Sequence, residues 1–173
     1  MRRGIALFVI GLLFGVLSYY LLSIPIITPV FSPEDGNEII EFIDDAENTI
    51  DIEVYVLTSR DVVDALARAK QRGVDIRIIL EQTTNKEIYE ELTSKGFNVK
   101  YASNFYKLTH SKFIIIDKKA VLVGSHNLSN SALNKNREAS VIIWDAKTVD
   151  EFLDAFETDW LLASLYYISC IKF

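Results

Sequence analysis

Six polar residues between positions 110 and 138 have types and spacings that suit chemistry on a negatively charged group. They are His110, Lys112, Asp117, Ser125, Asn127 and Glu138. An imidazole and an ammonium two residues apart share one face of a strand, and together they combine a nucleophile with a positive charge. Ser125 and Asn127 add a hydroxyl and an amide that suit phosphate oxygens. The set predicts an anion site with a nucleophile in it.

The neighbouring residues predict two short strands that would bring this set together. Phe113 to Ile116 form an uninterrupted apolar run, which is typical of a strand buried on both faces. His110 and Lys112 stand at its entrance. Residues 121–123 predict a second strand, paired with the first through a turn at 117–119. The hydroxyl and amide residues would then leave the second strand near the entrance of the first.

Taken jointly, H-x-K-x4-D followed six residues later by G-S-x-N resembles the motif of the phospholipase D superfamily and matches it at every fixed position. Glu138 also sits where that family carries a downstream glutamate. The resemblance is best for the small single-motif, nuclease-like branch and covers roughly residues 31–160. It implies two-step hydrolysis of a phosphodiester through a phosphohistidine, without a metal or another cofactor. A lone histidine or a lone G-S-x-N would carry little weight.

The resemblance implies a role for each residue. His110 attacks phosphorus, Lys112 holds the non-bridging oxygens, and Ser125 and Asn127 add hydrogen-bond donors. Glu138 is expected to hydrogen-bond a histidine nitrogen and so fix its tautomer.

Asp117 belongs to the motif, yet seven residues of strand place it roughly 20 Å from His110. We therefore expect it to brace a turn or the dimer contact. His126 occupies the variable position of G-S-x-N and would face away from its neighbours, so we interpret it as non-catalytic.

The number of motifs predicts the assembly. Members of this superfamily need two copies of the motif in one active site, and this chain has one. A homodimer is implied, in which each subunit contributes one His110 across a two-fold axis.

Composition bounds the remaining possibilities. The 173 residues, half of them hydrophobic, suffice for one domain with an appendage. The single cysteine, Cys170, excludes an internal disulfide and a cysteine-based zinc site, and two histidines weigh against a metal cluster. The net charge is -6, but residues 100–140 hold seven basic and two acidic residues. This predicts a locally basic site for an anionic phosphodiester, although Lys118 and Lys119 could simply form a solvated turn.

The amino-terminal segment predicts a membrane anchor. Arg2 and Arg3 precede an uncharged apolar run at 4–27, which exceeds the ~20 residues of a helical span. A cleaved signal peptide is the competing interpretation and would leave a soluble enzyme. Residues 28–59 contain no lysine or arginine, so the amino end is expected in the cytoplasm and the catalytic domain on the extracytoplasmic side.

The predicted organisation is an anchor and linker at 1–30, a catalytic domain at 31–160 and an apolar tail at 161–173. The tail could extend the final helix, cover the dimer seam or lie on the bilayer surface. The domain is expected to be α/β, with a mixed sheet flanked by helices on both faces. Helices are expected from 33, from 60 to 72, and at 85–95, 129–133 and 148–160, with strands at 50–57, 74–80, 97–101, 111–117, 121–123 and 138–144.

Three functions remain open. A membrane-tethered nuclease is favoured by the single motif and the local positive charge. A lipid phosphodiesterase of phospholipase D or cardiolipin-hydrolase type is favoured by the anchor and the apolar tail. A catalytically silent module is disfavoured by the intact motif. Phe105 and Tyr106, in the loop before His110, could stack on a base, touch an acyl chain or pack as an ordinary loop.

Overall fold

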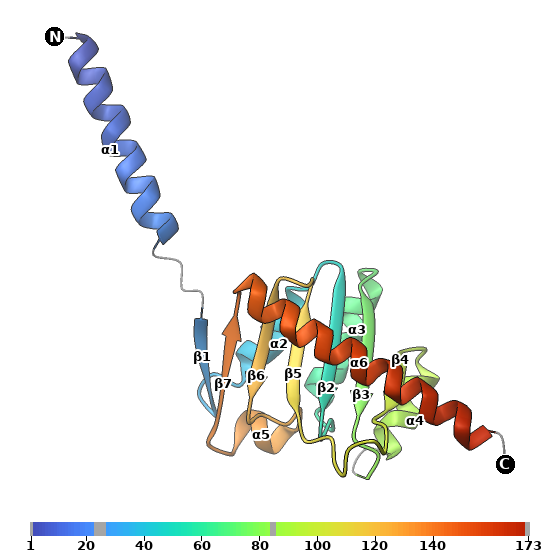
Figure 1. Ribbon diagram of the computed structural model, residues 1–173. Helices are drawn as coiled ribbons and strands as arrows, with labels where there is room; N and C mark the ends of the chain where they lie inside the picture. Colours follow the sequence, from blue (N-terminus) through green and yellow to red (C-terminus); the bar gives the residue numbers. More distant parts are fainter. Residues whose placement is uncertain (1, 23–26, 84–85, 172–173) are drawn as a thin grey trace.

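The structure, a computed structural model, describes residues 2–22, 27–83 and 86–171. It shows one seven-stranded sheet with helices against it, together with a separate amino-terminal helix (Figure 1). The elements in chain order are α1 (Arg2–Leu22), β1 (Ile27–Ser32), α2 (Asn37–Asp44), β2 (Thr49–Val54), α3 (Arg60–Gln71), β3 (Asp75–Leu80), α4 (Lys86–Ser94), β4 (Asn98–Tyr101), β5 (Lys112–Ile116), β6 (Ala120–Gly124), α5 (Asn130–Asn134), β7 (Glu138–Ile143) and α6 (Ala146–Ile171).

The sheet is mixed, as the sequence predicts. Its strand order is β1-β7-β6-β5-β2-β3-β4. Strands β2, β3 and β4 are parallel and are joined by α3 and α4, whereas the pairs from β1 to β2 through β7, β6 and β5 are antiparallel. Parallel neighbours need a long crossover, which the two helices supply, while a tight turn suffices between β5 and β6.

Helices cover both faces of the sheet. In Figure 1, α6 crosses one face, and α2 and α3 lie behind the other. The alternation along β5 follows this division: Ile114 and Ile116 belong to the core under α2–α5, whereas Phe113 and Ile115 pack with α6. A strand buried on both faces must be apolar at every position. This confirms the predicted architecture.

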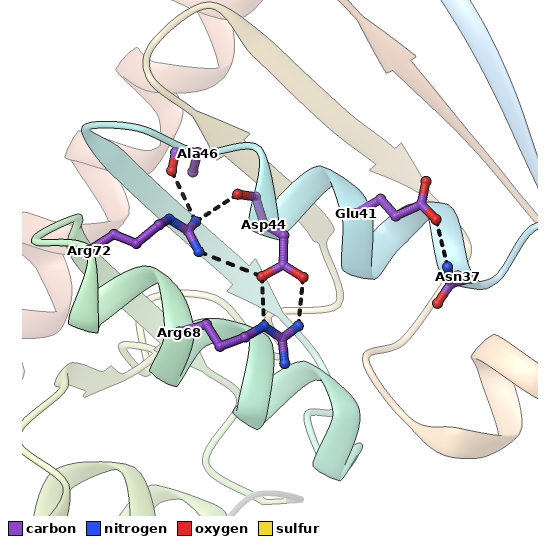
Figure 2. Close-up of polar contacts among 6 residues, drawn as sticks. All are labelled: Asn37, Glu41, Asp44, Ala46, Arg68 and Arg72. Atoms are coloured by element: carbon purple, nitrogen blue, oxygen red, sulfur yellow. Dashed lines mark hydrogen bonds and ion pairs between the residues drawn. The ribbon is translucent and has the colours of Figure 1, made fainter.

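Helices α2 and α3 are held together by polar contacts as well as by the core (Figure 2). Arg68 of α3 forms a two-point contact with the Asp44 carboxylate, with distances of 3.0 and 2.6 Å. Arg72 donates to the backbone oxygens of Asp44, at 2.7 Å, and of Ala46, at 3.1 Å. These contacts close the loop that leads from α2 into β2.

Two local predictions are wrong near the start of the domain. Residues 28–30, expected to be linker, belong to β1, which pairs with β7 along its whole length. Val30 and Ser32 are buried while Pro29 and Phe31 are exposed, the alternation of an edge strand, where a proline is tolerated. The following helix begins at Asn37 rather than at Pro33, because residues 33–36 form turns that lead out of the strand.

At the carboxyl end, α6 runs to Ile171, so the apolar tail does extend the final helix. At the amino end, no helix in the part of the chain that the structure describes combines the length and hydropathy needed to cross a membrane. The predicted anchor includes residues 23–26, which lie outside the described residues, as do Asn85 of a predicted helix and the last two residues of the tail. The anchor and its orientation stay predictions.

Candidate active site

Five of the six predicted site residues gather at one edge of the sheet, and Asp117 is the exception. Lys112, the first residue of β5, pairs with Val54 at the last position of β2. Gly124, the last residue of β6, pairs with Ser140 of β7. A Cβ atom at Gly124 would come within 2.3 Å of Ser140 Oγ, so the motif glycine allows β6 and β7 to approach here. The ends of four strands, β2, β5, β6 and β7, therefore meet where the motif side chains emerge.

His110 and Lys112 are in direct contact. Lys112 Nζ lies 3.2 Å from His110 Nδ1 and donates to the His110 backbone oxygen at 2.8 Å. The exposed imidazole also rests on the Tyr55 ring, with a centroid distance of 4.5 Å. An ammonium has no acceptor capacity, so a charged Lys112 makes Nδ1 the acceptor and leaves the ring hydrogen on Nε2.

Ser125 and Glu138 form the second pair at this edge. Ser125 Oγ donates to Glu138 Oε2 at 2.5 Å and accepts from the Ala139 backbone N–H at 3.0 Å. Asn136 Nδ2 donates to the other carboxylate oxygen, Oε1, at 3.0 Å. The carboxylate is thus oriented by two neutral donors. Within one chain it is held by Ser125 and Asn136, and His110 is paired with Lys112 instead of with Glu138.

The charges at this edge affect one another. Partial burial lowers the pKa of Lys112, and the negative charge of Glu138 acts in the opposite direction. The Ser125 hydrogen bond, together with that of Asn136, lowers the pKa of Glu138. Glu138 is therefore a carboxylate at neutral pH, and it favours the ammonium form of Lys112.

Asn127 lies beside this group with a polar atom unused. Its Oδ1 is buried and lacks a hydrogen-bond partner among the described residues. An amide oxygen is an acceptor, so a contact between Asn127 and a phosphate oxygen has to come from its amide N–H groups.

His126 points the other way, as predicted. It is 2 % exposed, and its Nδ1 lies 2.6 Å from Ser140 Oγ. Burial lowers the pKa of this imidazole. A buried, neutral ring below the sheet edge is not available to a substrate.

Asp117 lies at the opposite end of β5. Its carboxylate accepts the backbone N–H groups of Glu47, Asn48 and Thr49, with shortest distances of 3.0, 2.6 and 2.9 Å. It also stands in the tight turn to β6, with a φ angle of 52°, a conformation that aspartate tolerates. Although the motif includes it in the catalytic set, this position gives Asp117 a structural role.

The structure divides the predicted basic stretch between two places. Lys118 and Lys119 stand beside Asp117 in the turn far from His110. Lys100 bonds Ser164 of α6 and lies over the Trp160 ring, while Arg137 forms an ion pair with Glu34. The hairpin places charges that are close in the sequence at opposite ends of its strands. The excess of basic residues counted over 100–140 is therefore not concentrated at the site.

Two buried carboxylates hold the segment that carries His110, and sequence reasoning did not assign them to the site. Glu81 Oε2 accepts the Thr109 N–H at 3.1 Å, and Glu53 Oε1 accepts the Ser111 hydroxyl. For Glu53 the available signal was an acidic residue between the apolar residues Ile52 and Val54 of a strand, since such a residue needs a specific partner when it is buried. Among the described residues no group of three histidine, cysteine or acidic side chains could hold a metal ion.

With the geometry known, comparison with other proteins decides the family. Residues 39–160 match the family described as cardiolipin synthase, PLD-like domain. The chain belongs to the phospholipase D superfamily. Its curated relatives in this superfamily include a phospholipase D of Rickettsia prowazekii, 31% identical over 135 residues, and the mitochondrial cardiolipin hydrolase of Mus musculus, 30% identical over 118 residues. These matches cover 73% and 66% of the chain, and 64% and 53% of the relatives.

Two solved structures of small proteins align more completely. The phospholipase D family member Nuc from Salmonella typhimurium has a TM-score of 0.73 and 30% identity, and NucT from Helicobacter pylori has a TM-score of 0.68 and 25% identity. The alignments cover 79% and 78% of this chain and 94% of each of those chains. Membership of the phospholipase D superfamily places the chain among hydrolases that act on phosphodiester bonds.

Proposed function

We propose that the chain is a membrane-anchored endonuclease that cleaves phosphodiester bonds of DNA or RNA through a phosphohistidine at His110. The intact edge cluster of His110, Lys112, Ser125, Asn127 and Glu138 supports a phosphodiesterase. The nearly complete alignment with Nuc and NucT supports the small, single-motif form of the superfamily.

The observation that favours nucleic acid over lipid is the direction of β1. The chain enters the domain at Ile27, which pairs with Ile143, and reaches the site edge only at Ser32, which pairs with Glu138. Six strand residues separate the two edges by roughly 17–20 Å. A domain tethered through the segment before Ile27 therefore presents His110 away from that attachment point, toward a substrate in the surrounding solution.

Each chain supplies half of the chemistry. The sequence contains two histidines, and His126 is buried against Ser140. One accessible imidazole cannot serve both as the nucleophile and as the acid that protonates the leaving oxygen. We infer a homodimer in which the second imidazole is His110 of the partner subunit, and in which the Glu138 carboxylate becomes available to that ring.

The reaction follows from these groups in two balanced steps. Nε2 of one His110 attacks phosphorus, the P–O bond to the leaving alcohol breaks, and the second imidazolium gives that oxygen its proton. Water then loses a proton to the second imidazole and attacks phosphorus, which breaks the P–N bond and restores the first ring. Lys112, Ser125 and Asn127 offset the charge on the non-bridging oxygens.

Attack requires a change at Lys112. In the free site its ammonium engages Nδ1 of His110, which leaves hydrogen rather than a lone pair on Nε2. A bound phosphate is a stronger acceptor for Lys112. Once Lys112 turns to the substrate, Nδ1 can take the hydrogen and Nε2 becomes the nucleophile.

A phospholipase D or cardiolipin-hydrolase activity is the second candidate. Three apolar side chains in the loop before His110 are exposed, namely Phe105 at 73%, Tyr106 at 46% and Leu108 at 45%. They could touch acyl chains, and the curated relatives carry names of lipid enzymes. A silent binding module is the third candidate, and the complete set of polar groups at the sheet edge speaks against it.

The deciding experiment uses the full chain in detergent, with chelator and without added metal. Single-stranded DNA, RNA and anionic phospholipid vesicles are offered in parallel, beside His110→Ala. Cleavage of nucleic acid that disappears in the variant is expected. Turnover of lipid alone would reverse the preference, and no turnover of any substrate would support the silent module.

The shared site has its own test. Wild-type chains are dissociated and reassembled with an excess of His110→Ala chains. If both imidazoles serve one site, mixed dimers are inactive and activity falls more steeply than the wild-type fraction. A fall in simple proportion, or activity in a strictly monomeric preparation, would contradict the dimer.

A further inference from the structure

Two carboxyl groups meet behind the segment that carries His110, on the face of the sheet covered by α6. Glu53 of β2 is 2 % exposed, and Asp159 of α6 is half-buried. They are close enough for each carboxyl to influence the proton affinity of the other. Neither group has a part in the reaction described above, and burying two acids side by side is costly unless something is gained.

The hydrogen bonds of Glu53 are incomplete in an informative way. Its Oε1 accepts the hydroxyl of Ser111, the residue between His110 and Lys112. Its Oε2 is buried and has no hydrogen-bond partner among the described residues. Opposite lies another acid, which as an anion offers only acceptors. A proton held between the two carboxyls would supply the missing donor and remove one of the two negative charges.

Asp159 connects the pair to the other side of His110. The hydroxyl of Tyr106, in the loop that leads to His110, lies close enough to Asp159 to lower the pKa of that carboxyl. The contacts therefore run from the loop through α6 and β2 to Ser111, the residue just before β5. Tyr106 and Ser111 lie on either side of His110 in the sequence, so the pair contacts the reactive segment at both ends.

We propose that Glu53 and Asp159 share one proton, and that this bridge positions the segment 106–111 so that His110 and Lys112 face the substrate. Both are positioning residues because they reach the reaction only through Ser111 and Tyr106. The effect on turnover rests on the proposed phosphodiesterase function, whereas the shared proton can be measured without it.

The bridge is sensitive to pH near neutrality. Burial raises the pKa of Glu53 to about 7, opposed by the Ser111 hydrogen bond and reinforced by Asp159. Burial likewise raises the pKa of Asp159. The groups facing Glu53 are Asp159 from α6, Tyr106 from the loop before His110, and Ser111, the residue just before β5. Of the further charges on this face, Arg77 is paired with both Asp51 and Glu157, and Lys100 contacts Ser164 and the Trp160 ring of α6. Above the pKa of Glu53 the bridging proton leaves and two anions repel.

The sign of the stability change follows from the raised pKa. The folded protein holds this proton more tightly than the unfolded chain, so the stabilisation is complete below the ordinary glutamate pKa of 4.5 and is lost as pH rises through about 7. Chemical denaturation of the full chain at a series of pH values measures it. Glu53→Gln keeps the shape, donates permanently to Asp159 and should remove this part of the pH dependence.

Asp154→Asn is the matched control, because Asp154 is an exposed carboxylate on α6. It should leave the pH dependence of stability as in the wild type. If Glu53→Gln also leaves that dependence unchanged, the two carboxyls do not share a proton and the proposal is wrong.

Turnover of bis(p-nitrophenyl) phosphate tests the positioning role. The comparison of variants at each pH decides. Glu53→Gln should keep the wild-type kcat at pH 6 and extend its plateau to higher pH, whereas Glu53→Ala should lose about tenfold in kcat at every pH. If kcat declines at high pH in the same way in Glu53→Gln and in the wild type, the positioning role is wrong. An inactive wild type would contradict the proposed function, while the denaturation series would still decide the shared proton.

Discussion

The two ends of β5 carry residues of the same motif, and they differ in how fully their side chains are bonded. At one end the exposed His110 and the half-buried Lys112 mainly contact each other and Tyr55. At the other end the Asp117 carboxylate accepts three backbone N–H groups. Groups left with spare bonding capacity can engage a substrate, whereas a saturated carboxylate stabilises the fold. One motif thus combines a reactive edge with a structural one.

Removal of the His110 imidazole is expected to have the largest effect, and it tests whether this end of β5 is reactive and not structural. His110→Ala should lower hydrolysis by at least about 10³-fold, because both the covalent step and proton transfer depend on it. Its exposed ring contributes little to packing, so the midpoint of chemical denaturation should stay unchanged. A variant that unfolds instead of merely losing activity would assign His110 to the structure.

Substitution of Lys112 should lower the catalytic rate by a smaller factor. Lys112→Ala removes the positive charge at the site edge, and kcat should fall about 10²-fold. Lys112→Arg keeps the charge but not the compact ammonium, and it should recover part of the loss. Single-turnover rates on nucleic acid measure both, and equal activity of the alanine variant and the wild type would exclude contact with the phosphate.

At the other end of β5, a substitution of Asp117 should reduce the stability of the fold and leave the catalytic rate unchanged. Asp117→Ala leaves three backbone donors without their acceptor and should cost about 2 kcal/mol of unfolding free energy. The remaining folded protein should cleave at the wild-type rate, measured per folded molecule. A loss of kcat without a loss of stability would return Asp117 to the catalytic set.

The same carboxylate predicts an acid limit. The backbone donors of Thr49, Glu47 and Asn48, against the opposing effect of desolvation, lower the pKa of Asp117. Its stabilisation is therefore complete above the ordinary aspartate pKa of 3.8 and is lost as pH falls through the lower folded value. Asp117→Asn should flatten this acid slope in denaturation curves, and an unchanged slope would show that other groups cause it.

The smallest effect is expected at the neighbouring lysines. Lys118 and Lys119 lie at the structural end, beyond a Debye length of about 8–10 Å from the site. The double change to serine should leave both kcat and the salt dependence of nucleic-acid binding unaltered. A reduced salt slope would show that the substrate reaches across the domain to that edge.

The chemistry and its strands could be predicted because their signals are local. The unbroken apolar run of β5, the turn after it and the glycine at the end of β6 each reveal their structure within a few residues. The edge strand β1 could not be predicted in this way, because its hydrogen bonds go to a strand about a hundred residues later. Pro25, Pro29 and Pro33 around it are typical of a linker until β7 is known to lie alongside.

Charge and burial show the same limit. Counting residues 100–140 predicts one basic region, but the hairpin turns part of it toward the far edge. Glu53 is visible in the sequence as an acid between two apolar residues of a strand, but its partner Asp159 comes from the last helix. Which carboxyls meet is decided by the packing of α6 on the sheet, and no local pattern contains that information.

The pairing of β1 with β7 also bears on how the chain is made. The Glu138 N–H donates to Ser32 Oγ across a separation of 106 residues, so the first strand emerges from the ribosome long before its partner exists. Until β7 and α6 follow, one edge of the sheet is open and the apolar residues of β5 and β6 on the α6 face are uncovered. Such intermediates are prone to aggregate. A nascent chain of this kind benefits from chaperone protection late in synthesis, and truncations before residue 146 are poor substitutes for the complete domain.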